Sequence, residues 1–330
     1  MNKLSISFVI PTFNSQTYID SCINSILDQK LIEKISYEIL IIDGGSTDHT
    51  ISTLKKYKNI RILYNPLKTG ESGKFIGIKN SKYENICLID SDNLIDENYI
   101  YESLSYLKKD NNISGVEPIK FGYKSNMGII DKYCSLSGVN DPINLYFGNF
   151  DKTSVFFKNK WTKKKYENIY EDNKIIKFKI DHLDLPTIGA NGSIFKRLDL
   201  IKFLDQQNFS YFFDVDYIIF LQKIYGSINF IKIKLPVYHY YCGSNFLKFY
   251  KKQKRRINDF FKFEKFRIYN PKKQKKAIFL FICETIFFIS FLKSIYFSFK
   301  TKQPVLLIHS ILSFLTLFVY LTYFLKRKKN

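Results

Sequence analysis

The chain has 330 residues, of which 45% are hydrophobic and 17% aromatic, so it can bury a large core and is not an intrinsically disordered protein. Its 51 Lys and Arg residues against 30 Asp and Glu residues give a formal net charge of +21, which excludes an acidic protein and favours an anionic partner. About half of this excess lies in residues 248–276, which hold thirteen Lys and Arg and two acids. The five cysteines lack metal-site or disulfide spacing, which is typical of a reducing compartment.

Strand and helix signals alternate along the first 120 residues. Apolar, β-branched runs predict strands at 4–10, 37–43, 60–64 and 85–90. Helical periodicity and capping residues predict helices at 16–28, 48–57, 73–81 and 96–109. This alternation predicts the α/β class, with a Rossmann-like, doubly wound and mostly parallel sheet covered by helices on both faces.

The pattern is less regular from residue 121 to about 245. We expect an exposed insertion at 151–179, then a strand-like stretch at 187–196, a helix at 212–225 and strands at 227–234 and 237–241.

The last third of the chain has the pattern of a membrane-attached segment. Residues 246–269 are basic and aromatic at helical spacing, which predicts an amphipathic helix on a membrane surface. Residues 277–292 and 304–325 are apolar, and the second run is about 33 Å long as a helix and precedes four basic residues. We expect two transmembrane helices with both chain ends in the cytoplasm. A re-entrant or interfacial hairpin and a buried hairpin of a soluble fold are the alternatives.

The triplet Asp90, Ser91 and Asp92 follows the fourth predicted strand. Side chains at i and i+2 of an extended chain point the same way, so both carboxylates converge where open α/β sheets bind ligands. Such oxygen ligands suit Mg²⁺ or Mn²⁺ shared with substrate phosphates. Taken alone, the triplet is more often a solvated loop, so its context decides the interpretation.

Three segments provide that context. SFVIPTFNSQTYIDSCINSIL, EILIIDGGSTDHT and ICLIDSDN, in this order, resemble glycosyltransferase family 2, whose members use nucleotide-diphospho-sugars on the GT-A fold. The resemblance covers about residues 4–120 well and reaches about 245 more loosely. It implies a nucleotide-sugar-binding half at 1–120 and an acceptor-binding half at 121–245. We assign 246–276 to the membrane interface and 277–330 to the two transmembrane helices with a basic tail.

The resemblance also implies roles for individual residues. Asp43 is expected to hydrogen-bond the base, and Gly44 stands where the family has a second acid. Asp90 and Asp92 are the expected metal ligands, with His239 as a third candidate; a core histidine is the other interpretation of His239. The residues expected to bind the nucleotide sugar are Pro11, Thr12, Asn14, Asp43, Lys74, Asp90, Ser91, Gly189 and Asn191. A solvated lysine at 74 and an ordinary bulged strand around 189–191 are the alternatives.

Two further segments resemble parts of the family. FFDVDYIIFLQKIYG resembles the stretch that carries the catalytic base, which makes Asp214 the candidate base and Asp216 the runner-up, although helix capping is the other interpretation of both. One base without a second carboxylate implies a single displacement with inversion. Gln253, Arg255 and Arg256 resemble the QxxRW segment of membrane-bound relatives and are expected to bind the donor diphosphate or a lipid phosphate. A purely electrostatic lipid anchor is the alternative.

These features together predict a metal-dependent, inverting glycosyltransferase at the cell membrane, with a cytoplasmic catalytic domain. The expected donor is a UDP- or GDP-linked sugar, and the expected acceptor is a lipid-linked or cell-envelope glycan. A non-catalytic relative, a nucleic-acid-binding protein and a nucleotidyltransferase are the other hypotheses. We expect no nucleic-acid partner because the basic segment adjoins apolar spans. The loop PTFNSQ is not the Gly-rich loop of nucleotidyltransferases.

Overall fold

The computed structural model describes residues 3–148, 150–181, 191–269 and 275–327. The chain divides into two compact units, one made of Met1–Ile119 with Lys165–Tyr238 and the other of Lys120–Lys164 with His239–Asn330. The sequence placed boundaries near 120 and 245, whereas residues 165–238 return to the first unit. The assignment of segments to donor, acceptor and membrane stays a prediction.

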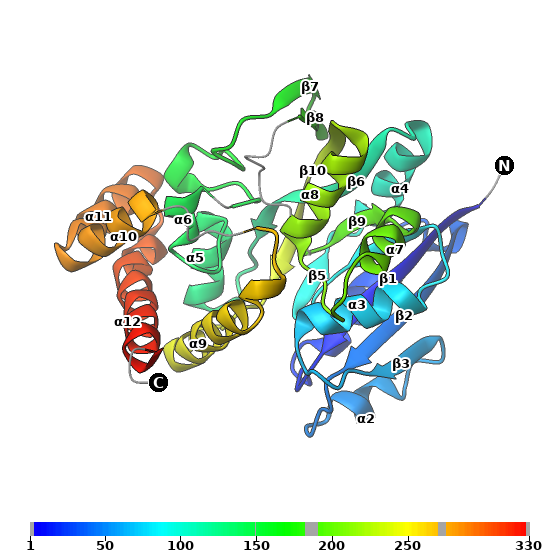
Figure 1. Ribbon diagram of the computed structural model, residues 1–330, viewed down its shortest axis with the longest axis horizontal. Helices are drawn as coiled ribbons and strands as arrows, with labels where there is room; N and C mark the ends of the chain where they lie inside the picture. The colour runs from blue at the N-terminus through cyan, green and yellow to red at the C-terminus, as the bar shows by residue number, and fades with distance from the viewer. Residues whose placement is uncertain (1–2, 149, 182–190, 270–274, 328–330) are drawn as a thin grey trace. The chain divides into compact units, whose positions relative to one another are not determined.

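The first unit is built on one mixed sheet (Figure 1) with the strand order β3-β2-β1-β4-β9-β6-β10-β8-β7 and with β5 paired to β10. The strands are β1 (Leu4–Thr12), β2 (Ile35–Asp43), β3 (Ile60–Tyr64), β4 (Asn85–Leu88), β5 (Asn93–Ile95), β6 (Ile113–Gly122), β7 (Glu167–Glu171), β8 (Ile175–Ile180), β9 (Ser193–Lys196) and β10 (Ile228–His239).

The first four strands of the sheet, β1 to β4, are parallel. Strand β9 is antiparallel to β4 and β6, and β8 is antiparallel to β7 and β10. The prediction of a mostly parallel sheet is therefore correct for the first four strands and wrong beyond them. The physical reason is connectivity: β7 and β8 are joined by a short turn, which allows only an antiparallel pair.

The helices of the first unit are α1 (Ile19–Leu27), α2 (Thr50–Leu54), α3 (Gly70–Asn80), α4 (Tyr99–Lys109), α7 (Arg197–Asp205) and α8 (Asp214–Tyr225), with a 3-10 turn, η1, at Ile32–Lys34. All four helices predicted in the first 120 residues are present. The second is shorter than predicted, although Asp48 does accept a hydrogen bond from the Thr50 backbone N–H at 3.0 Å.

Helix α3 lies unusually close to β1 and β2. A methyl group on Gly77 would come within 2.3 Å of Val9 Cγ1 and 2.8 Å of Ile42 Cδ1. One turn earlier, a methyl group on Gly73 would lie 2.9 Å from Pro11 Cβ. Glycine at both positions therefore lets the first turns of α3 approach the carboxyl end of β1, which positions Lys74 next to that edge of the sheet.

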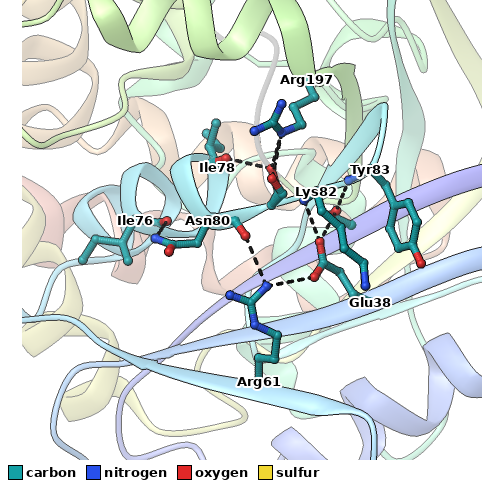
Figure 2. A network of polar contacts seen from close by, with 10 residues as sticks. Glu38, Arg61, Ile76, Ile78, Asn80, Lys82, Tyr83 and Arg197 are labelled. Carbon is teal, nitrogen blue, oxygen red and sulfur yellow. Dashed lines mark hydrogen bonds and ion pairs between the residues drawn. The ribbon is translucent and has the colours of Figure 1, made fainter.

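A buried carboxylate joins β1, β2, β3 and the end of α3, as Figure 2 shows. Glu38 Oε1 accepts hydrogen bonds from Ser7 Oγ at 2.7 Å and from the Lys82 backbone N–H at 2.8 Å. Its other oxygen lies 3.1 Å from Arg61 Nη1, which also donates to the Asn80 carbonyl oxygen at 3.3 Å. These partners stabilise the Glu38 carboxylate in the middle of a largely apolar strand.

The second unit is mostly helical, with α5 (Ile129–Ser137), α6 (Asn144–Phe147), α9 (Phe246–Lys262), α10 (Lys275–Ile286), α11 (Ile289–Thr301) and α12 (His309–Arg327). Three short 3-10 segments, η2 (Val155–Phe157), η3 (Glu264–Phe266) and η5 (Pro304–Ile308), lie between them. Asp131 Oδ1 accepts the backbone N–H groups of Cys242 and Gly243 at 2.8 Å each, which joins α5 to the segment that leads into α9.

The expected exposed insertion at 151–179 is only partly correct. Strand β7 is exposed throughout, but β8 is largely buried, as are Lys152, Ser154 and Trp161. The alternating burial of β8 shows that it is a regular strand of the sheet rather than part of an insertion.

Of the described residues, one helical segment, Pro304–Tyr323, is long and apolar enough to cross a membrane. Helices α10 and α11 pass the same test only together, and they are bent by 83° at the break between them. Length and composition therefore support one span, and the other predicted span is a bent pair of helices.

Candidate functional site

The loops after β1 and β2 hold each other in place at the carboxyl edge of the sheet. Asn14 Oδ1 accepts the Thr47 backbone N–H at 2.8 Å, and the Asn14 backbone N–H donates to Ser46 Oγ at 2.9 Å. The backbone φ of Asn14 is +49°, a conformation that Asn tolerates better than most residues. Asn14 is thus placed in the predicted loop, and these contacts give it a positioning role there.

The last residues of β1 are buried. Pro11 and Thr12 both lie in the sheet, and the Thr12 carbonyl oxygen accepts the Gly44 backbone N–H at 2.8 Å. Their side chains are therefore buried in the sheet and do not form an exposed surface.

Asp43 closes the turn that follows β2. Its Oδ2 accepts the backbone N–H groups of Gly45 and Ser46 at 2.9 Å each, and its Oδ1 accepts Ser46 Oγ at 2.6 Å. These donors use three of the roughly four acceptor positions of the carboxylate and leave one. The predicted contact with a nucleotide base is compatible with this geometry and stays a prediction.

The surroundings of Gly44 are narrow. A methyl group at this position would lie 3.3 Å from both the Phe13 ring and the Lys68 backbone. A larger side chain would displace one of these neighbours.

Lys74 lies near two other predicted site residues, Asp90 and Asp214. It is 6% exposed, and its Nζ lies 3.7 Å from Asp90 Oδ1. Burial would lower the pKa of Lys74, but the charges of Asp90, Asp214 and Glu71 outweigh burial and raise this pKa above its usual value. Lys74 is therefore a buried cation between the end of β4 and the start of α8, and its interpretation as a solvated lysine is wrong.

Two contacts bring the start of α8 to α3. The Phe212 backbone N–H donates to the Glu71 carbonyl oxygen at 3.1 Å, and the Tyr211 hydroxyl donates to Glu71 Oε2 at 3.1 Å. Asp214 and Asp216 both lie in the first turn of α8, and Asp216 is only 2% exposed. The charge of Asp214 acts on Lys74.

The DSD triplet is held by polar neighbours after β4. Ser91 Oγ lies 2.8 Å from Ser15 Oγ, and Asn93 Nδ2 lies 3.4 Å from Asp92 Oδ1 and 3.3 Å from Asn191 Oδ1. Asn93, fully buried, therefore joins the triplet to the segment before β9, and the predicted role of Asn191 in sugar binding stays a prediction. The only feature of the sequence that could have pointed to Asn93 is its position directly after the triplet. Gly189 lies outside the described residues.

The carboxylates fit a metal that shares its ligands with a substrate. In the described part of the chain, no three His, Cys, Asp or Glu side chains are grouped to hold an ion by themselves. Asp90, whose side chain is 39% exposed, and Asp92 would supply the one or two carboxylates that Mg²⁺ takes when phosphates complete its shell; their role as metal ligands stays a prediction. His239 belongs to the second unit, where its buried ring packs against the rings of Phe121 and Tyr241 at 5.6 and 5.3 Å.

The predicted phosphate-binding residues of α9 point in different directions. Gln253 is fully buried, and its Nε2 donates to the Asn140 carbonyl oxygen at 2.8 Å. Burial raises the pKa of Asp141, and the neighbouring Arg256 guanidinium opposes this rise. Arg255 and Arg256 are both exposed. Gln253 and Arg256 thus have partners within the second unit, and both arginines belong to the basic surface of α9.

Comparison with known proteins identifies the family. The model of glycosyl transferase family 2 matches residues 7–196, more than half of the chain. The chain belongs to this family. The poly(ribitol-phosphate) β-N-acetylglucosaminyltransferase TarP of Staphylococcus aureus is 29% identical over 185 residues, which are 54% of this chain and 53% of TarP. A poly(ribitol-phosphate) β-glucosyltransferase of Bacillus spizizenii is 36% identical over 98 residues, 28% of this chain and 15% of that enzyme.

Among solved structures, residues 1–349 of S. aureus TarS in complex with UDP-GlcNAc align with a TM-score of 0.46 at 14% identity, covering 76% of this chain and 65% of that one. The chain spans about half or less of the length of these curated relatives. The match of the family model confirms, at the level of the family, the resemblance inferred from the three motifs.

Proposed function

We propose that this protein transfers a sugar from a UDP-sugar to a hydroxyl group of a cell-envelope polymer, with inversion at the anomeric carbon. The observation that carries the proposal is the convergence of Lys74, Asp90 and Asp214 at the carboxyl edge of the parallel strands, in a chain of glycosyl transferase family 2. The named activities of TarP and of the Bacillus enzyme support poly(ribitol phosphate) or a similar polymer as acceptor. A lipid-linked glycan is the other acceptor class.

The geometry of Asp43 favours uridine over guanosine. Its carboxylate has one acceptor position left, and uracil presents a single ring N–H, whereas guanine presents an N–H and an NH₂ group together.

Each residue of the candidate site has its own role in the proposed reaction. In this proposal the Lys74 ammonium balances the charge of the diphosphate. Asp214, whose charge acts on Lys74, is the base that takes the proton of the acceptor hydroxyl as its oxygen attacks the anomeric carbon. The bond from that carbon to the diphosphate breaks, and the diphosphate leaves with the electron pair. Asp90 and Asp92 would hold Mg²⁺ or Mn²⁺, which when bound neutralises charge on the leaving group.

We further propose that the protein works at the cell membrane, with its catalytic unit on the cytoplasmic side where nucleotide sugars are made. The apolar segment Pro304–Tyr323 and the basic exposed side of α9 support this attachment.

The decisive experiment measures binding and transfer by the purified full chain. UDP-sugars with Mn²⁺ should raise the melting temperature, because a ligand at a hundred times its Kd stabilises the native state by about 2.7 kcal/mol. GDP-sugars should raise it less. Asp214→Asn should keep this shift but lose transfer, and Asp92→Asn should lose the part of the shift that depends on Mn²⁺.

Asp28→Asn, at an exposed carboxylate after α1, is the matched control and should change neither quantity. Full activity of Asp92→Asn would contradict the metal role. Pyrophosphate release from UTP and a sugar phosphate would instead indicate a nucleotidyltransferase, and no binding of any nucleotide sugar would indicate a non-catalytic member of the family.

A further inference from the structure

The exposed sides of helices α10 and α11 carry large apolar residues, and their buried sides carry small polar residues. Apart from Lys293, whose side chain is 43% exposed and pairs with Glu284, every exposed side chain in residues 277–299 is apolar or aromatic. Phe279, Phe287, Phe288, Leu292 and Phe299 are each at least 63% exposed. A helix on the surface of a soluble domain presents the opposite pattern. An exposed apolar surface of this kind marks contact with a partner or a membrane.

The buried side of the same helices carries hydroxyl groups. Thr285, Ser290, Ser294 and Ser298 are buried at helical spacing. Thr285 Oγ1 donates to the Phe281 carbonyl oxygen and Ser294 Oγ to the Ser290 carbonyl oxygen, both at 2.7 Å. Small hydroxyl residues that bond within their own helix and pack inward are typical of helices whose solvent is lipid.

The following segment has the same pattern of exposed apolar residues and buried polar residues. In residues 303–323 the exposed residues are again all apolar, whereas His309, Ser313 and Thr316 are buried. Because α10, α11 and α12 all expose apolar residues and bury polar ones, hydrocarbon is the environment that matches their surface.

An ion pair accompanies the bend between α10 and α11. Glu284 and Lys293 are nine residues apart, which is about 13.5 Å along a straight helix. In the structure Lys293 Nζ lies 2.7 and 2.6 Å from the two carboxylate oxygens of Glu284, and the Tyr146 hydroxyl donates to Glu284 Oε2 at 2.7 Å. Phe288, at the bend, has a φ of +56°, which is unfavourable for an L-residue. Straightening the pair into one span would break this ion pair.

The C-terminal part of helix α12 contacts the basic helix α9 (Figure 1). The rings of Tyr250 and Phe318 lie 6.3 Å apart, and those of Phe261 and Tyr323 stack at 4.5 Å. The exposed side of α9 carries Lys248, Lys251, Lys254 and Arg255. The part of α12 beside α9 must therefore stay near the headgroups, because these charges are strongly unfavourable in hydrocarbon.

The apolar residues that come before the contact between α12 and α9 form a stretch too short to cross a bilayer. Residues 304–317 precede the contact with α9 and measure about 21 Å at the helical rise, against a hydrocarbon core of about 30 Å.

We infer that α10, α11 and α12 seat the second unit in a single leaflet of an anionic bilayer and do not cross it, with the basic side of α9 on the headgroups. This inference rests on the membrane attachment in the proposed function and specifies its form. It places the end of α11 and the C-terminus on the same side of the membrane as α9, whereas a spanning hairpin places the end of α11 on the opposite side.

Cysteine accessibility tests this sidedness with the full chain expressed in a bacterium. In a Cys283→Ser background, Lys262→Cys, Lys300→Cys and Asn330→Cys report on the end of α9, the end of α11 and the last residue. A membrane-impermeant maleimide should label all three in sealed inside-out vesicles and none in intact spheroplasts. Labelling of Lys300→Cys from outside spheroplasts would show a spanning hairpin, and labelling of Asn330→Cys from outside would show that α12 crosses. Either result overturns the inference.

Vesicle flotation tests the docking surface itself. The purified chain should float with phosphatidylglycerol vesicles, less with phosphatidylcholine vesicles, and the double variant Phe287→Ser/Phe288→Ser should lower the bound-to-free ratio by about tenfold or more. Leu198→Ser, at a 65% exposed residue of α7 in the first unit, is the matched control and should leave the ratio unchanged. An unchanged ratio for the double variant, or no flotation of the wild type, overturns the inference.

The thermal shift with UDP-sugars is measured without lipid and separates the two proposals. A chain that binds UDP-sugar but does not float overturns the membrane seat alone. A chain that floats and labels as expected but binds no nucleotide sugar overturns the enzyme proposal alone.

Discussion

Replacing Lys74 by methionine tests whether a buried cation holds the candidate active site together. Its Nζ is 3.7 Å from Asp90 Oδ1, and at an effective dielectric constant of 20 such a pair attracts by roughly 4 kcal/mol. Burial of the ammonium and the 39% exposure of the Asp90 side chain offset much of this attraction. We therefore expect Lys74→Met to lower the free energy of unfolding by about 1–3 kcal/mol and to reduce the thermal shift with UDP-sugars.

The pH dependence of this loss follows from the raised pKa of Lys74. A lysine whose pKa is higher in the folded state contributes stability that is complete below its ordinary pKa of about 10.4 and is lost as the pH rises through the folded value. The deficit of Lys74→Met should thus be constant from pH 6 to 9 in urea unfolding.

Lys79→Met is the matched control on the same helix. Lys79 pairs with Asp205, but their side chains are 34% and 59% exposed, so this loss should stay below about 1 kcal/mol. If both variants lose the same stability, or if the deficit of Lys74→Met disappears between pH 6 and 9, the reasoning about a buried cation is refuted.

Two further predictions concern the packing around the site. Gly77→Ala should cost about 1–3 kcal/mol in chemical unfolding, because its methyl group meets Val9, whereas Gly70→Ala, where no described atom lies within 4 Å, should cost less than about 0.5 kcal/mol; equal losses would contradict the close approach of α3 to β1. Glu38→Ala should cost about 2–4 kcal/mol by the same measurement, because it removes the acceptor of a buried network and leaves Arg61 without this carboxylate. A loss below about 1 kcal/mol would show that the network contributes little.

Local pattern was sufficient for the strands that carry the site. Apolar, β-branched runs at β1 to β4 predicted buried parallel strands, and the residues that follow them were predicted to face the ligand edge. The triplet at Asp90 lies directly after β4, as expected. These features depend on neighbours along the chain, which a sequence records directly.

The second half of the sheet was predicted only in part. The strands expected at 227–234 and 237–241 form the single strand β10, and the stretch expected at 187–196 contains β9, whereas β5, β6, β7 and β8 were not predicted. Strand β5 has three residues and β9 has four, and each is stabilised by partners distant in sequence. Such short segments carry too few residues for a clear period, so pairing rather than propensity decides them.

The sequence alone determined the family, the order of the first strands and helices, and the positions of the acidic residues, because each depends on local spacing or on motif order. Only the tertiary structure decided that Lys74 is a buried cation between Asp90 and Asp214, because the three lie on elements brought together by packing. It likewise decided that the apolar run after residue 276, which contains neither Gly nor Pro, bends at Phe288. The contact of Glu284 with Lys293 and Tyr146 favours that bend, and a contact between distant groups leaves no signature in local pattern.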